Sequence, residues 1–528
     1  MTNFYKQILK RVNVYFLLFS LNLIDILTVG SILFTNKLNG LQDEILSQVT
    51  SVLHLISLIF GQINHNMFTG IPTGICSTII VEASVLFSGI YLVCLEKYSK
   101  EKALVNTLFI ISFSTLMLGL FSFFFSMFDI DYYVQAIPLE LVNGILAGSG
   151  LSMIFISRSL FLVEDIILSN LMFIFTFGIV ILIFYIEKKY SNIHFVPIIV
   201  VLTFFLIYRL YKFILNENPN IKPRTSFINS VDLLLNLQFN LIDLNNLLEF
   251  FPKILSLTCF CLIFLPFNLI VYNRITKVKI SSQREMKTQG MSNILGSIFC
   301  LPTYFVCSHS ITFYKSSCST QPDSMILALC YFLILFIADT IKSIAPIQIL
   351  AIFPLMVGLS LCKPALYLPK SLRNFYELIF TWGIAFLIGF NYSIPLVFLL
   401  GMLIALLDYL FVQLFYKSHE PSNTDIQSLF SSCDVLIIDY PLFFLNINKF
   451  LREITKIKKK EVLIDLNKCT AFDSLGNDVF INNLYSDKMY YLIGNPFFVE
   501  INEIFKDKSN VMHFKNHYDA IKYKKGNK

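Results

Sequence analysis

The sequence is poor in charge. Only 14% of its 528 residues are Asp, Glu, Lys or Arg, whereas a soluble globular chain averages about 25%. Hydrophobic residues make up 55% of the chain, and the mean hydropathy is +0.68. This composition excludes an ordinary soluble domain over most of the chain. The formal net charge of +6 is too small for this length to indicate a nucleic-acid partner.

Several patterns of catalytic and redox chemistry are also missing. The 11 cysteines include no CxxC pair and no Cys/His spacing typical of a metal site, and most lie in apolar runs such as CFCLIF at 259–264. We therefore expect buried apolar thiols rather than disulfides or metal ligands. No Walker-type phosphate loop is present. These absences predict a protein that is not an enzyme, binds no cofactor and does not use ATP directly.

The N-terminus lacks the pattern of a signal peptide. Its first apolar segment carries Asn22 and Asp25 and runs past residue 30, without a short uniform apolar core or a small-residue cleavage site. We interpret this segment as a retained membrane helix. Lys6 and Lys10 precede it, so the positive-inside rule predicts that residues 1–12 are cytoplasmic.

Long apolar segments are what the chain has in abundance. A helix needs about 20 predominantly apolar residues to cross a hydrocarbon core of about 30 Å. The sequence predicts about fourteen such helices. They span approximately residues 13–34, 46–65, 73–94, 104–128, 137–157, 161–186, 194–214, 254–275, 287–303, 304–318, 324–342, 344–365, 373–390 and 394–415. An even number of spans returns the C-terminus to the cytoplasmic side.

A polar connection at about 215–250 divides these segments into two halves, about 13–214 and 254–415. The third segment of the first half opens with FTGIPTGI at 68–75, and its counterpart in the second half holds SHSITF at 308–313, shortly after a proline. Glycine, proline and polar residues interrupt a membrane helix at both places. Interrupted helices at matching places in two halves indicate a transporter site built by inverted repeats.

The composition changes after the membrane domain at 13–416. A polar linker at 417–432 leads into alternating strand and helix patterns over 433–520, and a basic tail follows at 521–528. Strands are predicted in DVLIIDY, EVLIDLN and MYYLIG, and a helical pattern follows each of them. We therefore expect a small soluble α/β domain at the C-terminal end.

These blocks resemble the SulP-type anion transporter family, whose members carry a C-terminal STAS domain. VLIIDYPLFFLNINKFLREI and EVLIDLNKCTAFDSLGNDVF resemble that domain, and Asp473, Ser474 and Gly476 match the loop that opens one of its helices. In the membrane part, REMKTQGMSNILGSIFCLPTYFVCSHSITFYKSS resembles the stretch from the loop after helix eight into helix ten. NLIDILTVGSILF and TGICSTIIVEASVLF are most similar to the fungal vacuolar-type branch. Ser474 either is phosphorylated, as in bacterial regulatory STAS proteins, or caps the following helix.

The resemblance implies a nucleobase-transporter-like fold of about fourteen helices in a seven-plus-seven inverted repeat, followed by the STAS domain. Helices three and ten of this fold are half-helices, and substrate binds between their N-termini. Unpaired backbone N–H groups and the positive end of the helix dipole suit such termini to an anion. The substrate-binding residues implied are Thr73, Gly74, Ile75, Cys76, Ser308, His309 and Ser310.

Titratable groups inside the predicted membrane helices are few. His309 stands where related transporters often have Arg, and it either tunes anion binding with pH or packs as a neutral hydrogen-bonding group. Asp25 and Glu82 lie within predicted helices one and three, where each either relays a proton or makes a contact between helices. Asn268 matches a helix-eight position that is acidic in many relatives, which disfavours cation coupling there.

The function expected from these features is secondary transport by alternating access in a multi-pass membrane protein. The substrate is a small anion (sulfate, chloride, bicarbonate or a carboxylate), or an amino acid as the vacuolar-type resemblance would allow. The alternative is a non-transporting receptor or scaffold that displays the STAS domain. We expect a homodimer through the transmembrane and STAS domains, with membrane lipid as a partner and no nucleic acid. The plasma membrane and a vacuolar or other internal membrane are both open.

Overall fold

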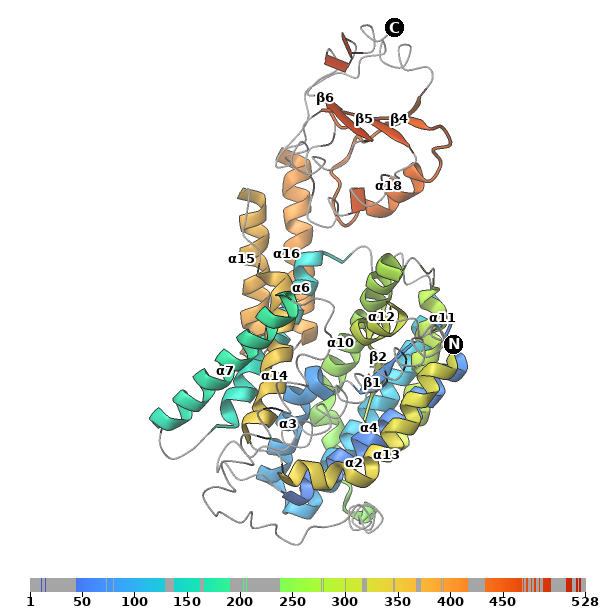
Figure 1. The fold of residues 1–528 in the computed structure, drawn as a ribbon. Helices are drawn as coiled ribbons and strands as arrows, with labels where there is room; N and C mark the ends of the chain where they lie inside the picture. Colours follow the sequence, from blue (N-terminus) through green and yellow to red (C-terminus); the bar gives the residue numbers. More distant parts are fainter. Residues whose placement is uncertain are drawn as a thin grey trace. The chain divides into compact units, whose positions relative to one another are not determined.

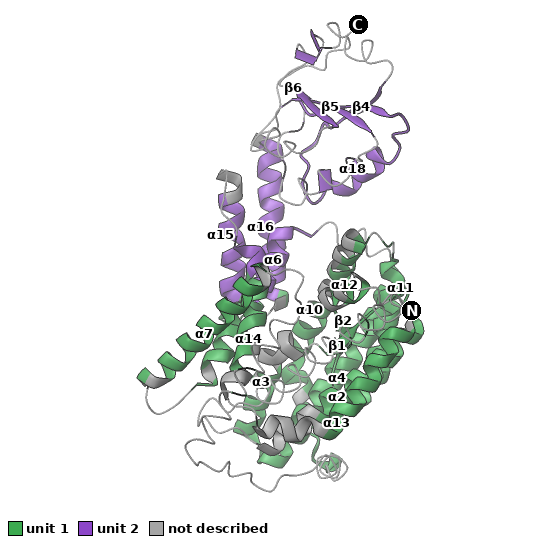
Figure 2. Cartoon of the chain, viewed as in Figure 1, with its two compact units in different colours: residues 1–130, 149–362, 388–395 green, residues 131–148, 363–387, 396–528 purple. Residues whose placement is uncertain are grey.

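The computed structural model describes residues 44–128, 137–189, 238–415 and 433–467 apart from short gaps, and scattered residues from there to 523. Long helices dominate the first three ranges, and a small sheet lies near the C-terminus (Figure 1). The chain divides into two compact units (Figure 2). Unit 1 comprises residues 1–130, 149–362 and 388–395, and unit 2 comprises residues 131–148, 363–387 and 396–528.

Most of the predicted membrane segments coincide with helices. Those lying wholly in unit 1 are α2 (Glu44–Phe68), α3 (Ile80–Lys97), α4 (Lys100–Phe125), α7 (Ile166–Lys189), α10 (Asn245–Thr276), α11 (Ser282–Gly296), α12 (Cys307–Lys315), α13 (Gln321–Ile344) and α14 (Ile347–Cys362). The helix α10 includes Pro252 and begins well before the predicted residue 254. The end of the predicted polar connection at 215–250 is therefore helical.

Two helix pairs in unit 1 pack extensively against each other. The helix α4 lies against α11, and α2 lies against α13. The α4–α11 crossing is especially close, because a Cβ atom at Gly119 would lie 2.6 Å from Ile294 N and one at Gly290 would lie 2.8 Å from Phe123 N. Only glycine leaves room for two helix backbones at this distance.

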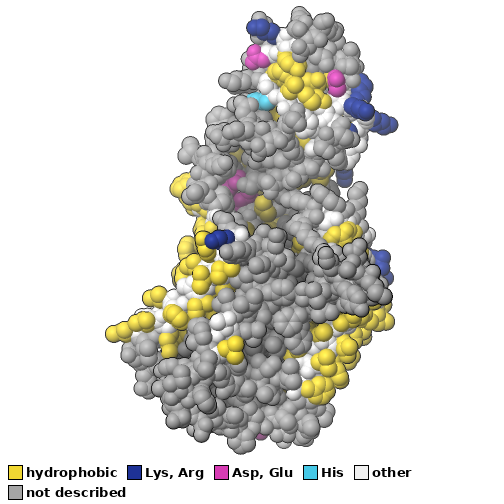
Figure 3. Space-filling view, viewed as in Figure 1, with side chains coloured by type: hydrophobic (Ala, Val, Ile, Leu, Met, Phe, Trp, Pro, Cys, Tyr) yellow, Lys and Arg dark blue, Asp and Glu magenta, His cyan; other side chains and the backbone are white. Residues whose placement is uncertain are grey.

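Apolar side chains face outward along several of these helices. On α7, Ile167, Leu171 and Ile174 are 74%, 62% and 67% exposed, and their spacing places them on one helix face. Figure 3 shows hydrophobic side chains along the outer surface of the helices. Within the described residues, four helices are long and apolar enough to cross a membrane, namely Lys100–Phe125, Leu139–Arg158, Ser169–Ile186 and Pro395–Leu414. Outward apolar faces on such helices fit a protein embedded in lipid.

The C-terminal part of unit 2 contains a parallel sheet. Its strands are β3 (Asp434–Ile437), β4 (Glu461–Asp465), β5 (Met489–Ile493) and β6 (Val511–Phe514), which lie side by side in sequence order. The helix α18 (Ile447–Ile454) connects β3 to β4. Apolar clusters cover both faces of the sheet, as parallel sheets require. The three predicted strands are confirmed, whereas β6 was not predicted.

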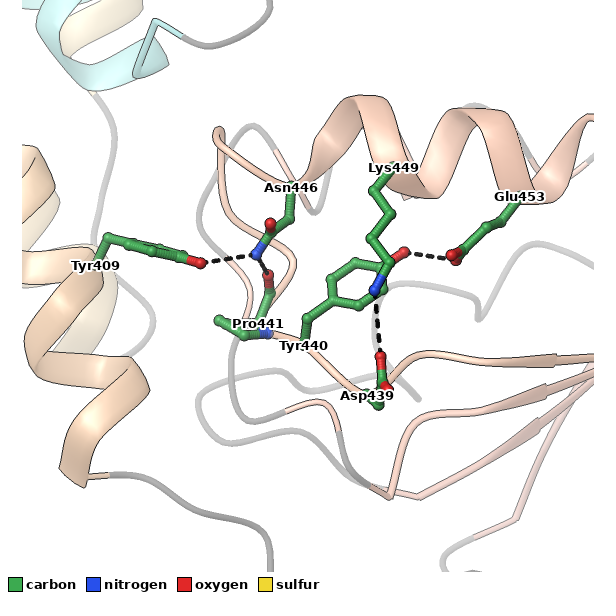
Figure 4. A network of polar contacts seen from close by, with 7 residues as sticks. All are labelled: Tyr409, Asp439, Tyr440, Pro441, Asn446, Lys449 and Glu453. Atoms are coloured by element: carbon green, nitrogen blue, oxygen red, sulfur yellow. Dashed lines mark hydrogen bonds and ion pairs between the residues drawn. The ribbon is translucent and has the colours of Figure 1, made fainter.

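The last membrane helix and the α/β domain are in direct contact within unit 2. Tyr409 lies on α16 (Ile394–Phe415), and its ring packs against Phe443 and Phe444 at centroid distances of 5.9 and 6.4 Å. Asn446 Nδ2 donates to the Tyr409 hydroxyl oxygen at 3.2 Å and to Pro441 O at 2.9 Å (Figure 4). The loop between β3 and α18 is therefore tied to α16.

A second group of polar contacts holds this loop to α18 (Figure 4). Lys449 Nζ lies 3.9 Å from the centroid of the Tyr440 ring and 3.4 Å from Asp439 Oδ1. The Tyr440 hydroxyl donates to Glu453 Oε2 at 2.7 Å. Burial, reinforced by this acceptor, raises the pKa of Tyr440, so the phenol keeps its proton and remains a donor at neutral pH.

Candidate functional site

The two interrupted segments meet in the interior of unit 1. The strand β1 (Cys76–Thr78) pairs antiparallel with β2 (Thr303–Phe305), so that Cys76 lies opposite Phe305 and Thr78 opposite Thr303. We call this two-stranded pair the ribbon. The helix α3 begins two residues after β1, and α12 begins two residues after β2. Both helix N-termini are therefore placed by the ribbon.

Two buried amide side chains bond to the ribbon from flanking helices. On α2, Gln62 Oε1 accepts from Cys76 N at 2.8 Å, and Gln62 Nε2 donates to Gly74 O at 3.0 Å. On α11, Asn293 Oδ1 accepts from Thr303 N at 2.8 Å, and Asn293 Nδ2 donates to Thr303 O at 2.9 Å. Each amide supplies a donor and an acceptor, as a neighbouring strand would. Four backbone groups in or beside the ribbon are thereby satisfied away from water.

A serine joins the start of α12 to the first segment. Ile75 N donates to Ser310 Oγ at 2.9 Å, and the Ser310 hydroxyl donates to Val306 O at 2.7 Å. Val306 N in turn donates to Ile75 O at 2.9 Å. The structure therefore brings together Ile75 and Ser310, which the sequence analysis placed at one site. The Ser310 hydroxyl is occupied by these protein contacts.

The predicted start of the half-helix in the first repeat is wrong. Residues 73–76 were expected at a helix N-terminus, but Cys76 lies in β1 and α3 begins at Ile80. The physical reason is that pairing with β2 and with Gln62 satisfies the backbone of this stretch in extended form. Gly74 has a packing role, since a Cβ there would lie 2.2 Å from His65 Nε2.

The other predicted site residues are located less completely. Ser308 and His309 lie in α12, Glu82 in α3 and Asn268 in α10, where Asn268 is half-buried. The side chains of Ser308, His309 and Glu82 are outside the described part of the structure. Gly476 is buried in a helical turn. Asp25, Thr73, Asp473 and Ser474 lie outside the described residues.

Sequence reasoning missed a polar face on α2 and its partners. His54 Nδ1 lies 2.6 Å from Thr78 Oγ1 of β1. At the end of α2, Thr69 Oγ1 and Gly70 N donate to the two carboxylate oxygens of Glu285 at 2.7 and 2.6 Å. A signal was present in the sequence, because polar residues recur on one side of α2 at helical spacing.

Comparisons with known proteins place this geometry in context. Residues 161–382 match the Sulfate permease family, whereas no curated protein matches the chain. The overall structure of SLC26A9 matches this chain with a TM-score of 0.57 and 14% sequence identity. The match covers 98% of this chain and 90% of that chain. The inward-facing murine Slc26a9 anion transporter is 15% identical, with 98% and 92% covered and a TM-score of 0.54. The transmembrane domain of a cyanobacterium bicarbonate transporter, BicA, is 14% identical, with 74% and 97% covered and a TM-score of 0.53.

The family match and the structural likenesses differ in what they establish. At 14–15% identity, the likenesses show the fold alone. The family match covers the region from α7 into α15 (Leu372–Gly389), which includes β2 and α12. Together with the apolar helices, this match indicates an integral membrane protein. The chain therefore shares the fold of SLC26A9, and its residues 161–382 are similar to the Sulfate permease family.

Proposed function

We propose that this protein is a secondary transporter of a small anion, which binds at the ribbon where α3 and α12 begin. One observation carries the proposal. Ile75 and Ser310 are 235 residues apart in sequence, yet their segments pair in the interior, and each segment leads directly into a helix. Helix N-termini carry unpaired N–H groups and partial positive charge, which favour an anion. The sulfate permease match supports the same substrate class.

The contacts within the ribbon refine which groups would bind the anion. The N–H groups of Ile75 and Cys76 already donate to Ser310 and Gln62. We therefore assign the binding donors to the first turns of α3, near Ile80, and of α12, at Ser308 and His309. These turns carry the N–H groups that have no acceptor within their own helices.

The remaining parts of the proposal concern charge, coupling and assembly. His309 would supply the positive charge beside the anion when protonated, and Asp25 or Glu82 would relay a proton. Transport would proceed by alternating access, with both termini cytoplasmic. The α/β domain would be a STAS domain that supports a homodimer. The fold likeness to anion and bicarbonate transporters supports this assignment as a whole.

Uptake into proteoliposomes tests the function. Purified wild-type protein should take up one or more of sulfate, chloride, bicarbonate or a carboxylate in a saturable way. His309→Ala should weaken anion affinity and flatten its dependence on pH. Ser114→Ala is the matched control, because the Ser114 hydroxyl donates to Ile110 O of its own helix. Uptake should then match that of the wild type.

Other outcomes would contradict the proposal in distinct ways. Saturable uptake of amino acids without any anion would favour the vacuolar-type alternative. Folded protein that takes up no solute would favour a receptor or scaffold. An unchanged affinity and pH profile in His309→Ala would leave anion transport intact and remove His309 from the site.

A further inference from the structure

Basic side chains gather on the α/β domain at the end of α18. Residues 449–460 contain six Lys or Arg residues and a single acid, Glu453. Figure 3 shows Lys and Arg side chains along one side of this domain. Four of the exposed basic residues in the segment form what we call the basic patch, namely Arg452, Lys456, Lys458 and Lys460.

The packing of α18 fixes the direction in which the basic patch faces. Phe450 and Ile454 are buried in the apolar cluster on one face of the sheet. Arg452 lies about half a turn around the helix axis from them, and Lys456 follows Arg452 at the spacing of one helical turn. The apolar side of α18 is therefore covered by its own domain, and the basic side remains available to a partner.

Two nearby acids are already engaged within the domain. Glu453 Oε2 accepts a hydrogen bond from the Tyr440 hydroxyl. Asp434 Oδ2 accepts from Lys458 N and Lys459 N at 2.8 and 2.9 Å, and Lys459 Nζ lies 3.9 Å from Asp434 Oδ1. These contacts hold the turn that carries the lysines. The ammonium groups of the three lysines in the basic patch form no hydrogen bond or ion pair with the part of the chain that the structure describes.

Contacts within unit 2 place the start of α18 near a membrane surface. Tyr409 of α16 packs against Phe443 and bonds to Asn446. It lies five residues before the end of the apolar helix segment Pro395–Leu414, which is about 8 Å along the helix, and Tyr is typical of membrane–water interfaces. Arg452 follows Asn446 by six residues, or about 9 Å along a helix. The basic patch is therefore carried within reach of lipid headgroups.

An anionic lipid surface fits these features better than a soluble partner does. A basic cluster beside a membrane helix attracts phosphatidylserine and phosphoinositide headgroups, and each Lys or Arg near the surface strengthens binding about fivefold. The dipole of α18 favours Arg452 in its last turn, but it does not account for Lys458 and Lys460, which lie beyond the helix. A nucleic acid or an acidic protein would need no membrane helix beside the basic patch.

We propose that the basic patch binds the headgroups of anionic phospholipids in the adjacent leaflet. The proposal rests on the cytoplasmic position of both termini in the proposed function, because anionic lipids are concentrated in the cytoplasmic leaflet. The contact is electrostatic, since the apolar side of α18 is buried in the domain. Bound lipid would hold α18 along the membrane surface and, through Asn446 and Tyr409, would also hold the end of α16.

Lysine acetylation in nanodiscs tests the proposal residue by residue. Purified full-length protein is placed in nanodiscs of phosphatidylcholine alone or of an equal mixture with phosphatidylserine, and acetylation by acetic anhydride is followed by mass spectrometry. The three lysines of the basic patch should react roughly fivefold more slowly in the anionic nanodiscs. Lys522 is the matched control, because it is exposed and its neighbour Tyr523 packs in the apolar cluster on the other face of the sheet. Its rate should be the same in both nanodiscs.

Two double variants separate lipid binding from mere proximity to the membrane. Arg452→Glu with Lys456→Glu should return Lys458 and Lys460 to the rate seen in neutral nanodiscs. Arg452→Lys with Lys456→Arg keeps the charge and should keep both lysines protected. Salt at about 1 M should also remove the protection, because the screening length falls to about 3 Å. If a double variant does not fold, the wild-type comparison between the two nanodiscs decides alone.

Three results would overturn the proposal. They are equal reactivity of the basic patch in both nanodiscs, equal slowing of Lys522, and protection in neutral nanodiscs by inositol hexakisphosphate, polyglutamate or an RNA oligonucleotide that matches protection by lipid. The last result would assign the basic patch to a soluble polyanion. Both leaflets of the nanodisc contain phosphatidylserine and no uptake is measured, so the result depends neither on orientation nor on transport. Lipid binding and the proposed function therefore fail separately.

Discussion

Replacing Gly290 by alanine is expected to force α4 and α11 apart. A Cβ at this position would lie 2.8 Å from Phe123 N and 3.0 Å from Gly119 O, whereas ordinary contacts begin at 3.4 Å. The gap must therefore widen by about 0.6 Å, and both obstructing atoms belong to the backbone of α4. Overpacking against a backbone falls near the upper end of the usual cost, about 3 kcal/mol. The higher helix propensity of alanine offsets about 1 kcal/mol, so the net destabilisation is about 2 kcal/mol.

The assay compares melting temperatures of purified full-length variants in one detergent. Gly290→Ala should melt several degrees below the wild type, and Gly119→Ala should behave in the same way because it faces the same crossing. Gly296→Ala is the control on the same helix, since no atom of another described element lies within 4 Å of its Cβ position. It should melt no lower than the wild type. If Gly290→Ala and Gly296→Ala melt together, the close α4–α11 crossing is refuted.

Three other predictions concern the ribbon and the α/β domain. Asn293→Leu leaves the buried Thr303 N–H without its acceptor, so the free energy of unfolding should fall by about 1–3 kcal/mol, and an unchanged melting temperature would contradict the role of the amide. Two backbone N–H groups hold the pKa of Asp434 below its ordinary value, so its stabilising effect exists above the unfolded-state pKa and is lost as pH falls through the folded-state pKa. Asp434→Asn should make unfolding of the domain, followed by circular dichroism, less dependent on pH below about 5, and an unaltered acid transition would argue against this. Tyr409→Phe should cost about 1 kcal/mol through the bond from Asn446, whereas Tyr409→Ala should cost more because Phe443 and Phe444 lose a packing partner. Equal hydrogen exchange of α18 amides in both variants would count against the contact.

The sequence predicted the places where membrane helices are interrupted but not the structure that replaces them. Strands of three residues, such as Cys76–Thr78, are too short for an alternating pattern to be recognised. Their stability depends on Gln62 and Asn293, whose partners are identified only once the helices are packed. For this reason, residues 73–76 were assigned to a helix start that lies at Ile80.

In the α/β domain too, the local sequence predicts some strands, whereas another is defined only by its tertiary contacts. The apolar runs that form β4 and β5 are bounded by polar residues and were predicted correctly. The strand β6 consists of four half-buried residues, and only its pairing with β5 defines it. Likewise, Glu285, Gln289 and Ser292 of α11 line the same space as His65 of α2 only once the helices are packed. The sequence alone does not show which of its many polar side chains will lie together without hydrogen-bond partners.

Closure of the ribbon also sets an order of events during biosynthesis. Ile75 emerges from the ribosome 235 residues before Ser310, its hydrogen-bond partner. At about 5–20 residues per second, this delay is roughly 10–50 s. Throughout that time the segment around Ile75 must wait in or near the bilayer without its partner strand, and exposed backbone groups are unfavourable there. Translation speed and membrane insertion factors should therefore influence the yield of folded protein.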